Sequence, residues 1–421
     1  MREDIERRFS EACERYAELG VDVLKALSEI EQVSLSMHCW QGDDVGGFEA
    51  PDSELAGGGI AVTGNYPGRA RDIDELRADA EKAFSLIPGS HRFNLHAIYG
   101  DFKGQRIERN MIEPEHFESW IEWAKELEIG LDFNSTLFSH PMADSGFTLS
   151  SMDEGVRKFW IEHVEACRNI GAYMGQVLET PCVHNIWIPD GSKDNTLLRL
   201  RHREHLRDSL DIIFGRDYPD EHLKDAVESK LFGIGSESFV VGSHDFYLAY
   251  ALANGRMLCM DMGHYHPTES VAEKVSALLP FFDELLLHVS RPVRWDSDHV
   301  VILNDDLKEL TSEIVRAKAL SRVNIALDFF DAELNRVGAW AIGMRSTLKA
   351  LLLALLEPVA KLREFEEDGN KFARLALLEE AKNLPFGDVW DYYCASMEAP
   401  NGAGMIDAVM SYEDEVLLKR G

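Results

Sequence analysis

Cysteine is scarce in this 421-residue chain, and its placement excludes the usual cysteine-based sites. The six cysteines are scattered and form no CxxC pair. Several lie in apolar runs, where a reduced thiol behaves as a small hydrophobe. We therefore expect free thiols and a reducing, cytoplasmic location. The first twelve residues, MREDIERRFSEA, are charged and amphipathic, which is unlike a signal peptide.

Long apolar runs and positive charge are also lacking. The longest apolar stretch, LKALLLALLEP at 348–358, falls short of the roughly 20 residues that a membrane-spanning helix needs. The formal net charge is −31, and no basic patch interrupts it. Because such a charge repels phosphate groups, it disfavours binding to nucleic acids and to anionic membranes. A neutral small molecule or a cation suits this chain better.

What the chain has is a regular alternation of two patterns. Short apolar runs predict eight strands, at 33–38, 92–98, 129–134, 182–188, 225–231, 257–262, 284–290 and 323–330. Stretches with helical spacing lie between them, at 71–87, 114–128, 152–178, 197–214, 270–282, 305–319 and 332–356. An alternation of this kind predicts the α/β class, with a parallel sheet covered by helices.

Eight such units fit a (β/α)8 TIM barrel, and this is the predicted fold. A doubly wound open sheet is the alternative, but no GxGxxG follows the first predicted strand. Residues 1–30 predict an extra N-terminal helix, so the barrel unit is expected to span residues 1–356. Residues 357–421 predict a C-terminal helical extension, which we expect to serve oligomerisation.

Ligand-type side chains gather where the later strands end. In a parallel barrel all carboxyl ends open on one face, and that face holds the site. The later strands deliver four such residues to it: Glu228, Asp261, His288 and Asp328. Three crowded carboxylates raise one another's pKa, and a divalent cation removes that cost. Oxygen ligands with one imidazole suit Mn²⁺, Mg²⁺ or Co²⁺ better than a thiolate-type zinc site would.

A second set lies on the loops and consists of His264, Asp296 and Asp298. Three ligands leave coordination positions open for substrate or water, as a catalytic metal requires. Lys230 follows Glu228 at strand spacing, so we expect it to pair with that carboxylate or to face a substrate oxygen. An ordinary capping or hydrogen-bonding role is favoured for three other rim residues, which are His140, His266 and Asp331.

Aromatic residues and one long loop flank these candidates. Trp40, Trp187 and Phe330 could be plain core residues, or they could form a platform for a sugar ring. The loop over 41–68 is long and rich in glycine, and loops of this kind often act as lids over active sites.

The segments that carry these residues resemble the L-rhamnose isomerase family. The resemblance runs over residues 1–421, in order and at matching separations. It rests on SMHCWQGDD, TGNYPG, LDFN followed by FSHP, NIWIPDG, VESKLFGIG, DMGHYHPTE, HVSRPVRWDSDHV and LDFFDAELNR. It implies a (β/α)8 barrel, usually tetrameric, that interconverts L-rhamnose and L-rhamnulose with divalent metals, commonly Mn²⁺. The partners expected are therefore a small sugar and three further copies of the chain.

The resemblance also implies roles for the candidates. A structural metal would bind Glu228, Asp261, His288 and Asp328, and a catalytic metal would bind His264, Asp296 and Asp298. Lys230, His96 and Asp328 would serve the chemistry. The substrate would contact Trp40, His96, Trp187 and Lys230. Since rhamnose carries a methyl group, part of the pocket should be apolar, with candidates Trp187, Phe133, Phe330, Ile60 and Val62.

Several alternatives stay open on the sequence. Two ions per subunit are expected, with Mn²⁺ first and Co²⁺, Zn²⁺ or Mg²⁺ as alternatives. The hydrogen could move between C2 and C1 as a hydride, or the reaction could pass through an enediol. A metal-dependent hydrolase is a weak rival, since the first strand ends in SMHCW with a single histidine rather than HxH. A non-catalytic sugar-binding protein would not need seven ligand-type residues.

Overall fold

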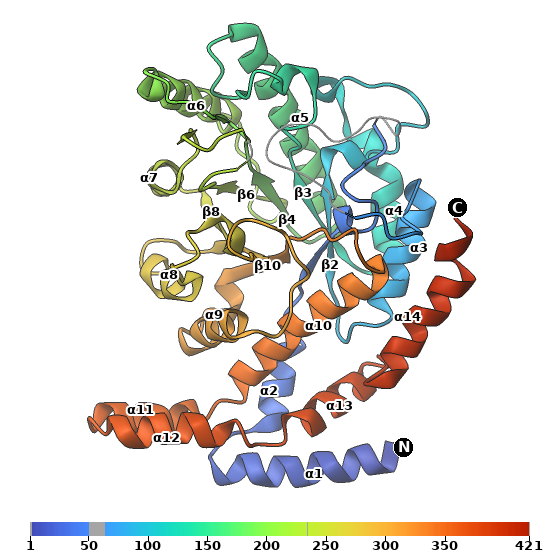
Figure 1. The fold of residues 1–421 in the computed structure, drawn as a ribbon, viewed down its shortest axis with the longest axis vertical. Helices are drawn as coiled ribbons and strands as arrows, with labels where there is room; N and C mark the ends of the chain where they lie inside the picture. The colour runs from blue at the N-terminus through green and yellow to red at the C-terminus, as the bar shows by residue number, and fades with distance from the viewer. Residues whose placement is uncertain (1, 50–63, 234, 421) are drawn as a thin grey trace.

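The computed structural model of the chain describes residues 2–49, 64–233 and 235–420. Eight parallel strands close into a barrel in the order β1-β10-β9-β8-β6-β4-β3-β2 (Figure 1). Their bounds are β1 Ser36–His38, β2 Arg92–His96, β3 Gly130–Asn134, β4 Cys182–Ile186, β6 Leu223–Glu228, β8 Met257–Asp261, β9 Leu285–Val289 and β10 Val323–Leu327. The predicted TIM barrel is confirmed, and the open doubly wound sheet is wrong, because β1 pairs with both β2 and β10.

One helix follows each barrel strand and packs outside it. These helices are α3 Ile73–Phe84, α4 Glu118–Glu126, α5 Glu154–Leu178, α6 Arg199–Ile213, α7 His244–Asn254, α8 Val271–Leu278, α9 Asp305–Arg316 and α10 Arg336–Leu355. Polar side chains start several of them: Asp72, Asp153, Asn304 and Asn335 each accept a backbone N–H of the first turn. Three tryptophans, Trp120, Trp160 and Trp340, are fully buried in the layer between strands and helices.

The structure differs from the predicted elements in a few places. The predicted helix over 1–30 is two helices, α1 Arg2–Glu18 and α2 Val23–Ile30, because Gly20 adopts a left-handed φ of +78° between them. Helix α7 and the two-residue strands β5 Gly191–Ser192 and β7 Phe239–Val240 were not predicted. The fifth predicted strand begins at Leu223 and ends at Glu228, so Lys230 lies just beyond it.

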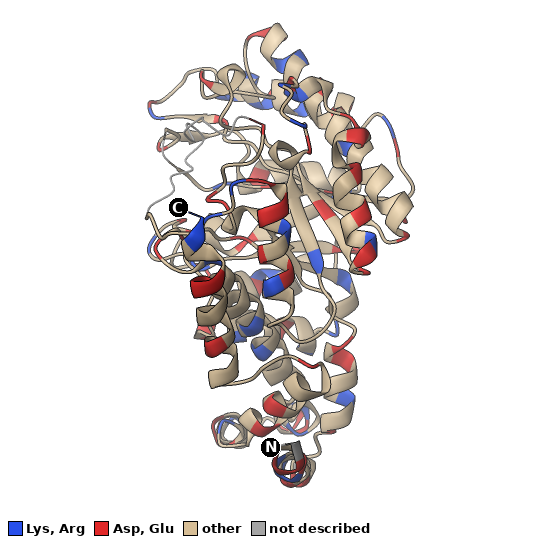
Figure 2. Cartoon of the chain, turned by 90° about the vertical axis from the view of Figure 1, so that its right-hand side faces the viewer, with Lys and Arg blue, Asp and Glu red and all other residues tan. Residues whose placement is uncertain are grey.

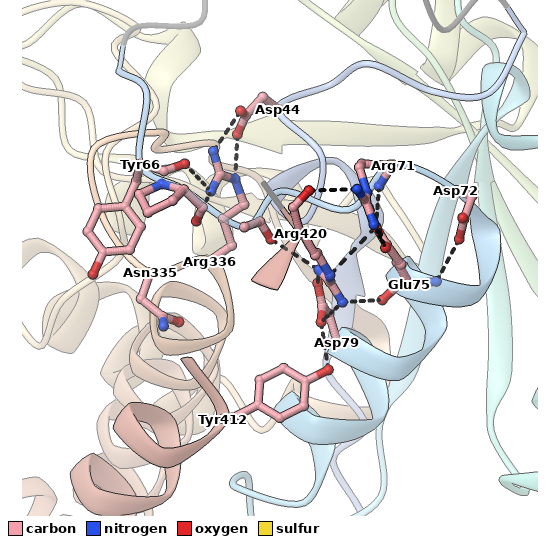
Figure 3. Close-up of polar contacts among 12 residues, drawn as sticks. Asp44, Tyr66, Arg71, Asp72, Glu75, Asp79, Asn335, Arg336, Tyr412 and Arg420 are labelled. Carbon is pink, nitrogen blue, oxygen red and sulfur yellow. Dashed lines mark hydrogen bonds and ion pairs between the residues drawn. The ribbon is translucent and has the colours of Figure 1, made fainter. Parts of the chain in front are cut away.

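The C-terminal segment is helical, as expected, and returns to the barrel. It comprises α11 Val359–Glu367, α12 Lys371–Ala381, α13 Phe386–Ser396 and α14 Ala403–Glu415. Helix α13 packs on α1 (Figure 1). At this contact the rings of Phe9 and Tyr392 stack with centroids 3.7 Å apart. At the chain's end, Arg420 binds the buried Asp79 of α3 with N···O distances of 2.6 and 2.8 Å (Figure 3). The division at residue 356 stays a prediction.

Charges of both signs are spread along the helices rather than segregated, as Figure 2 shows for one side of the molecule. Among the residues described, no single helix is long and apolar enough to cross a bilayer. Helices α10 and α11 reach the required length and composition only as a pair that is bent by 52°. Most of α10 is buried within this fold.

Candidate metal centre and substrate pocket

Four ligand-type side chains meet where the later barrel strands end. Glu228 closes β6, Asp261 closes β8, His288 lies on β9, and Asp328 follows β10. Because Asp261 and His288 are register partners on adjacent strands, their side chains lie on the same side of the barrel wall. His288 Nδ1 is 3.4 Å from a carboxylate oxygen of Glu228 and 3.4 Å from one of Asp328. One ligand atom from each of the four lies within 4.8 Å of the others.

A second cluster shares this corner of the barrel mouth and consists of Asp261, His264 and Asp296, with ligand atoms again within 4.8 Å. His264 Nδ1 is 3.0 Å from Glu228 Oε1, and its Nε2 is 3.1 Å from Asp296 Oδ2. His264 ends the short helical turn that begins directly after β8. The sequence grouped Asp298 with His264 and Asp296, whereas the structure places Asp261 there, and Asp298 lines the same pocket.

The electrostatics of the two clusters are those expected of side chains that can hold divalent cations. Burial raises the pKa of Asp298, and the nearby Asp296 raises it further. Burial opposes charge on His264, but Asp261 and Asp296 raise its pKa well above the ordinary value. Nδ1 of both His264 and His288 is buried and lacks hydrogen-bond geometry to any described partner. Imidazole nitrogens that face carboxylates without bonding them are suited to share a metal ion with those carboxylates.

Further hydrogen bonds fix the direction of the candidate ligands. The indole N–H of Trp40 donates to Asp328 Oδ1 at 3.0 Å. The side-chain amide of Asn185 donates to Glu228, and the Ser290 hydroxyl donates to Asp261 Oδ1 at 3.0 Å. Partners of this kind hold a ligand's oxygen in place and commonly affect metal affinity.

A cavity opens above the clusters and includes their outer ligands in its wall. Lys230 lies in this wall with Nζ 5.0 Å from the centroid of the Trp187 ring, and burial lowers its pKa to about 8. Gly233 leaves room for it, since a Cβ there would lie 2.7 Å from Lys230 Nζ. Burial also lowers the pKa of His96 to about 3, so that its imidazole is neutral. His96 Nδ1 is 3.1 Å from the Thr136 hydroxyl.

Comparisons with known proteins identify the family of the chain. The family model described as L-rhamnose isomerase (RhaA) matches residues 3–420. The L-rhamnose isomerase of Rhodopirellula baltica is 56% identical over 417 residues, which is 99% of this chain and 97% of that one. The chain belongs to the L-rhamnose isomerase family. The L-rhamnose isomerase of Bacteroides thetaiotaomicron is 55% identical over 418 residues, which is 99% of each chain.

Among solved structures, the fold is similar to that of an L-ribulose 3-epimerase. The TM-score is 0.46 and the sequence identity is 11%, over 79% of this chain and 98% of that one.

The pocket and the two clusters bring together most of the residues that the sequence singled out. His140, His266, Asp331 and Phe133 lie elsewhere. His140 accepts the N–H of Met142 as a local cap, and His266 is exposed and contacts Thr268. Asp331 accepts the N–H of Glu333, while Asn335 caps the following helix. Phe133 does not line the pocket, because it points into the layer between strands and helices and packs edge-on against Phe117. Ile60 and Val62 lie outside the described residues.

Several pocket residues were missed by the sequence reasoning. Trp40, Trp187 and Phe330 line the cavity as expected of platform residues, but Phe138, Phe232 and Trp295 line it too. Phe138 and Trp295 stand inside the FSHP and RPVRWDSDH segments that carry the resemblance. Large aromatic residues between candidate ligands in those segments were the signal that could have identified them.

Proposed function

We propose that the chain interconverts L-rhamnose and L-rhamnulose by moving the C2 hydrogen to C1 as a hydride, with the help of bound divalent cations. The observation that carries this proposal is the placement of two adjoining ligand clusters at the wall of one cavity. Membership of the L-rhamnose isomerase family supports rhamnose as the substrate.

The residues present fit two divalent ions per subunit. The first would be held by Glu228, Asp261, His288 and Asp328, and the second by His264, Asp296 and Asp298. Asp261 belongs to both clusters, so this carboxylate would help to hold the second ion as well. We expect Mn²⁺, with Co²⁺, Zn²⁺ or Mg²⁺ as alternatives, because the ligands are mainly oxygens. When bound, such cations polarise a carbonyl group and stabilise negative charge that develops on adjacent oxygens.

Lys230 and His96 would orient the sugar and assist in proton movements. The ammonium group of Lys230 faces the cavity from beyond β6 and would donate a hydrogen bond to the carbonyl oxygen, O1 of the open-chain aldose. His96 is neutral and can accept or donate one proton, so it suits opening of the pyranose ring at the ring oxygen. The edge of its ring packs against Trp40, with centroids 4.7 Å apart, which limits its rotation.

Asp328 is placed to handle the proton that must move between O2 and O1. Its Oδ1 accepts the Trp40 N–H, and its Oδ2 lies 3.4 Å from His288 Nδ1. A water molecule held by this carboxylate would carry the proton. Turnover of rhamnose deuterated at C2 separates the two routes: retention of deuterium at C1 supports the hydride shift, whereas loss to solvent supports the enediol route.

Metal dependence tests the proposal as a whole. Chelator-treated protein should lose ketose formation from L-rhamnose, and added Mn²⁺ should restore it. Equal turnover by the stripped and reloaded forms would contradict the proposal. Hydrolysis of esters or phosphates by the reloaded protein would instead support a hydrolase, and sugar binding without turnover would support a binding protein.

We also propose a homotetramer in the cytoplasm, with residues 357–421 as the oligomerising extension of a 1–356 barrel unit. Exposed apolar residues on α12 support this assignment, since Phe372 is 81% exposed, Leu375 is 59% exposed, and no residue of the helix is buried. Light scattering of Phe372→Asp should show dissociation. An unchanged tetramer would place the interface elsewhere, and cell fractionation tests the location.

A further inference from the structure

One buried cysteine lies directly beneath the proposed metal centre. Cys259 stands on β8 two residues before Asp261, so both side chains point into the barrel. It is fully buried and is the register partner of Glu228 on β6. Below the carboxylates, Cys259 packs in a small apolar cluster of the barrel interior with Val183, Ala226, Met257, Leu286 and Ala326. The thiol therefore lies at the boundary between the candidate metal ligands and this apolar cluster.

Cys259 also completes a third ligand group. Its Sγ, a Glu228 carboxylate oxygen and a His288 ring nitrogen lie within 4.8 Å of one another. His288 Nδ1 is buried and has no hydrogen-bond partner among the described residues. One sulfur, one nitrogen and one oxygen are the donors that tetrahedral Zn²⁺ and other thiophilic cations prefer, with a fourth position left for water.

We propose that Cys259, Glu228 and His288 form a soft-metal corner that captures Cd²⁺ in place of the working cation. As the metal–sulfur bond forms, the thiol proton leaves to solvent and one water leaves the cation, without a redox change. Because Cys259 lies one step deeper in the barrel than Asp261, a cation held by it sits farther from Lys230 and the sugar cavity. Soft cations at this corner therefore inhibit.

The corner shares Glu228 and His288 with the metal centre proposed above, so it rests on that proposal. Its test measures binding rather than turnover. The metal-stripped full-length protein is titrated with Cd²⁺ while ultraviolet absorption is recorded, since a thiolate bound to Cd²⁺ gives a charge-transfer band. A parallel titration measures Mn²⁺ affinity. The variants are Cys259→Ser and, as control, Cys182→Ser, which changes an equally buried cysteine on β4 that belongs to none of the ligand groups found among the described residues.

The wild type and Cys182→Ser should show the band at one equivalent of Cd²⁺, and Cys259→Ser should not. Cd²⁺ affinity should fall about 10-fold or more in Cys259→Ser, while Mn²⁺ affinity stays within about 3-fold of wild type. Cys259→Ala gives the same comparison if the serine variant does not fold. The charge-transfer band of the wild type also tests the proposal by itself, without any variant.

Cd²⁺ binding to the wild type without the band would overturn the soft-metal corner, as would an equal loss of Mn²⁺ and Cd²⁺ affinity in Cys259→Ser. Neither result would affect the oxygen-rich centre. If the wild type bound neither Mn²⁺ nor Cd²⁺, the proposed metal centre itself would be wrong, so the two failures are distinguishable.

Discussion

The hydrogen bond from Trp40 to Asp328 offers a sharp test of the metal centre. Replacing Trp40 by phenylalanine keeps an aromatic ring in the pocket wall but removes the indole N–H, which lies 3.0 Å from Asp328 Oδ1. The carboxylate then loses the donor that fixes its direction toward His288. Trp187→Phe is the matched control, because its indole N–H lies in the same pocket and is buried without a hydrogen-bond partner among the described residues.

The expected size of the effect follows from two independent considerations. A hydrogen bond to a charged group contributes about 1.5–3 kcal/mol. Loss of a group that orients a metal ligand weakens binding by about 10- to 100-fold, which corresponds to about 1.4–2.7 kcal/mol. The two ranges agree, so Trp40→Phe should weaken Mn²⁺ binding about 10- to 100-fold. Trp187→Phe should leave Mn²⁺ affinity within about 3-fold of wild type.

Calorimetric titration of the stripped proteins with Mn²⁺ measures both variants under one condition. A role for this hydrogen bond in metal binding is refuted if Trp40→Phe binds Mn²⁺ as tightly as the wild type does. It is also refuted if the two variants lose affinity equally, because aromatic volume rather than the donated hydrogen bond would then be the cause. Circular dichroism of each variant serves to show that the barrel is intact.

Three further predictions concern the pocket and its supports. Lys230→Met should lower kcat about 100- to 1000-fold, as loss of an oxyanion donor does, with Mn²⁺ affinity nearly unchanged in a parallel titration; an equal loss of affinity would make Lys230 a structural residue. Burial lowers the pKa of His91 from 6.5 to about 4, so below pH 6.5 the unfolded chain binds a proton that the folded chain does not, and stability falls as the pH falls. His91→Gln should therefore reduce the loss of unfolding free energy between pH 7 and pH 4, measured by urea denaturation, by up to about 3 kcal/mol; an unchanged pH profile would contradict this. Arg168→Met removes the guanidinium that holds the buried Asp225 at 2.8 Å and leaves this carboxylate with His184 Nδ1 at 2.9 Å, so it should cost up to about 3–5 kcal/mol of stability; adding Asp225→Asn should recover part of the loss, and no recovery would argue against the pair.

The strand–helix order could be predicted from sequence because most barrel strands are short apolar runs bounded by turns. Seven of the eight predicted strands contain the observed strand. The fifth was predicted at 225–231, whereas the observed strand is Leu223–Glu228. The reason lies in LKDAVE, residues 223–228, where Lys224 and Asp225 separate Leu223 from the apolar pair that follows and so hide the start of the strand. Helix α7 was missed because HDFYLAYALAN is apolar on nearly all sides and shows little helical periodicity.

The ligand types at strand ends could also be predicted, since parallel strands must open on one face. The division of these residues into two clusters could not be predicted, because it depends on the path of the loop that follows β9. Asp261 joins His264 and Asp296 only because that loop brings Asp296 over the turn after β8, where its Oδ1 lies 2.3 Å from the position of a Cβ on Gly263. The bonds from Trp40 and Asn185 likewise cross between strands that are distant in sequence.

The strands β1 and β10 are neighbours in the ring although nearly 290 residues separate Ser36 from its register partner Ala326. Trp40 and Asp328 follow these two strands, and their hydrogen bond bridges the last joint to be made as the ring closes. A growing chain whose β10 is still inside the ribosome therefore lacks the pairing between β1 and β10, and it also lacks one wall of the cavity. Acquisition of tightly held Mn²⁺ during synthesis should therefore mark the moment of barrel closure.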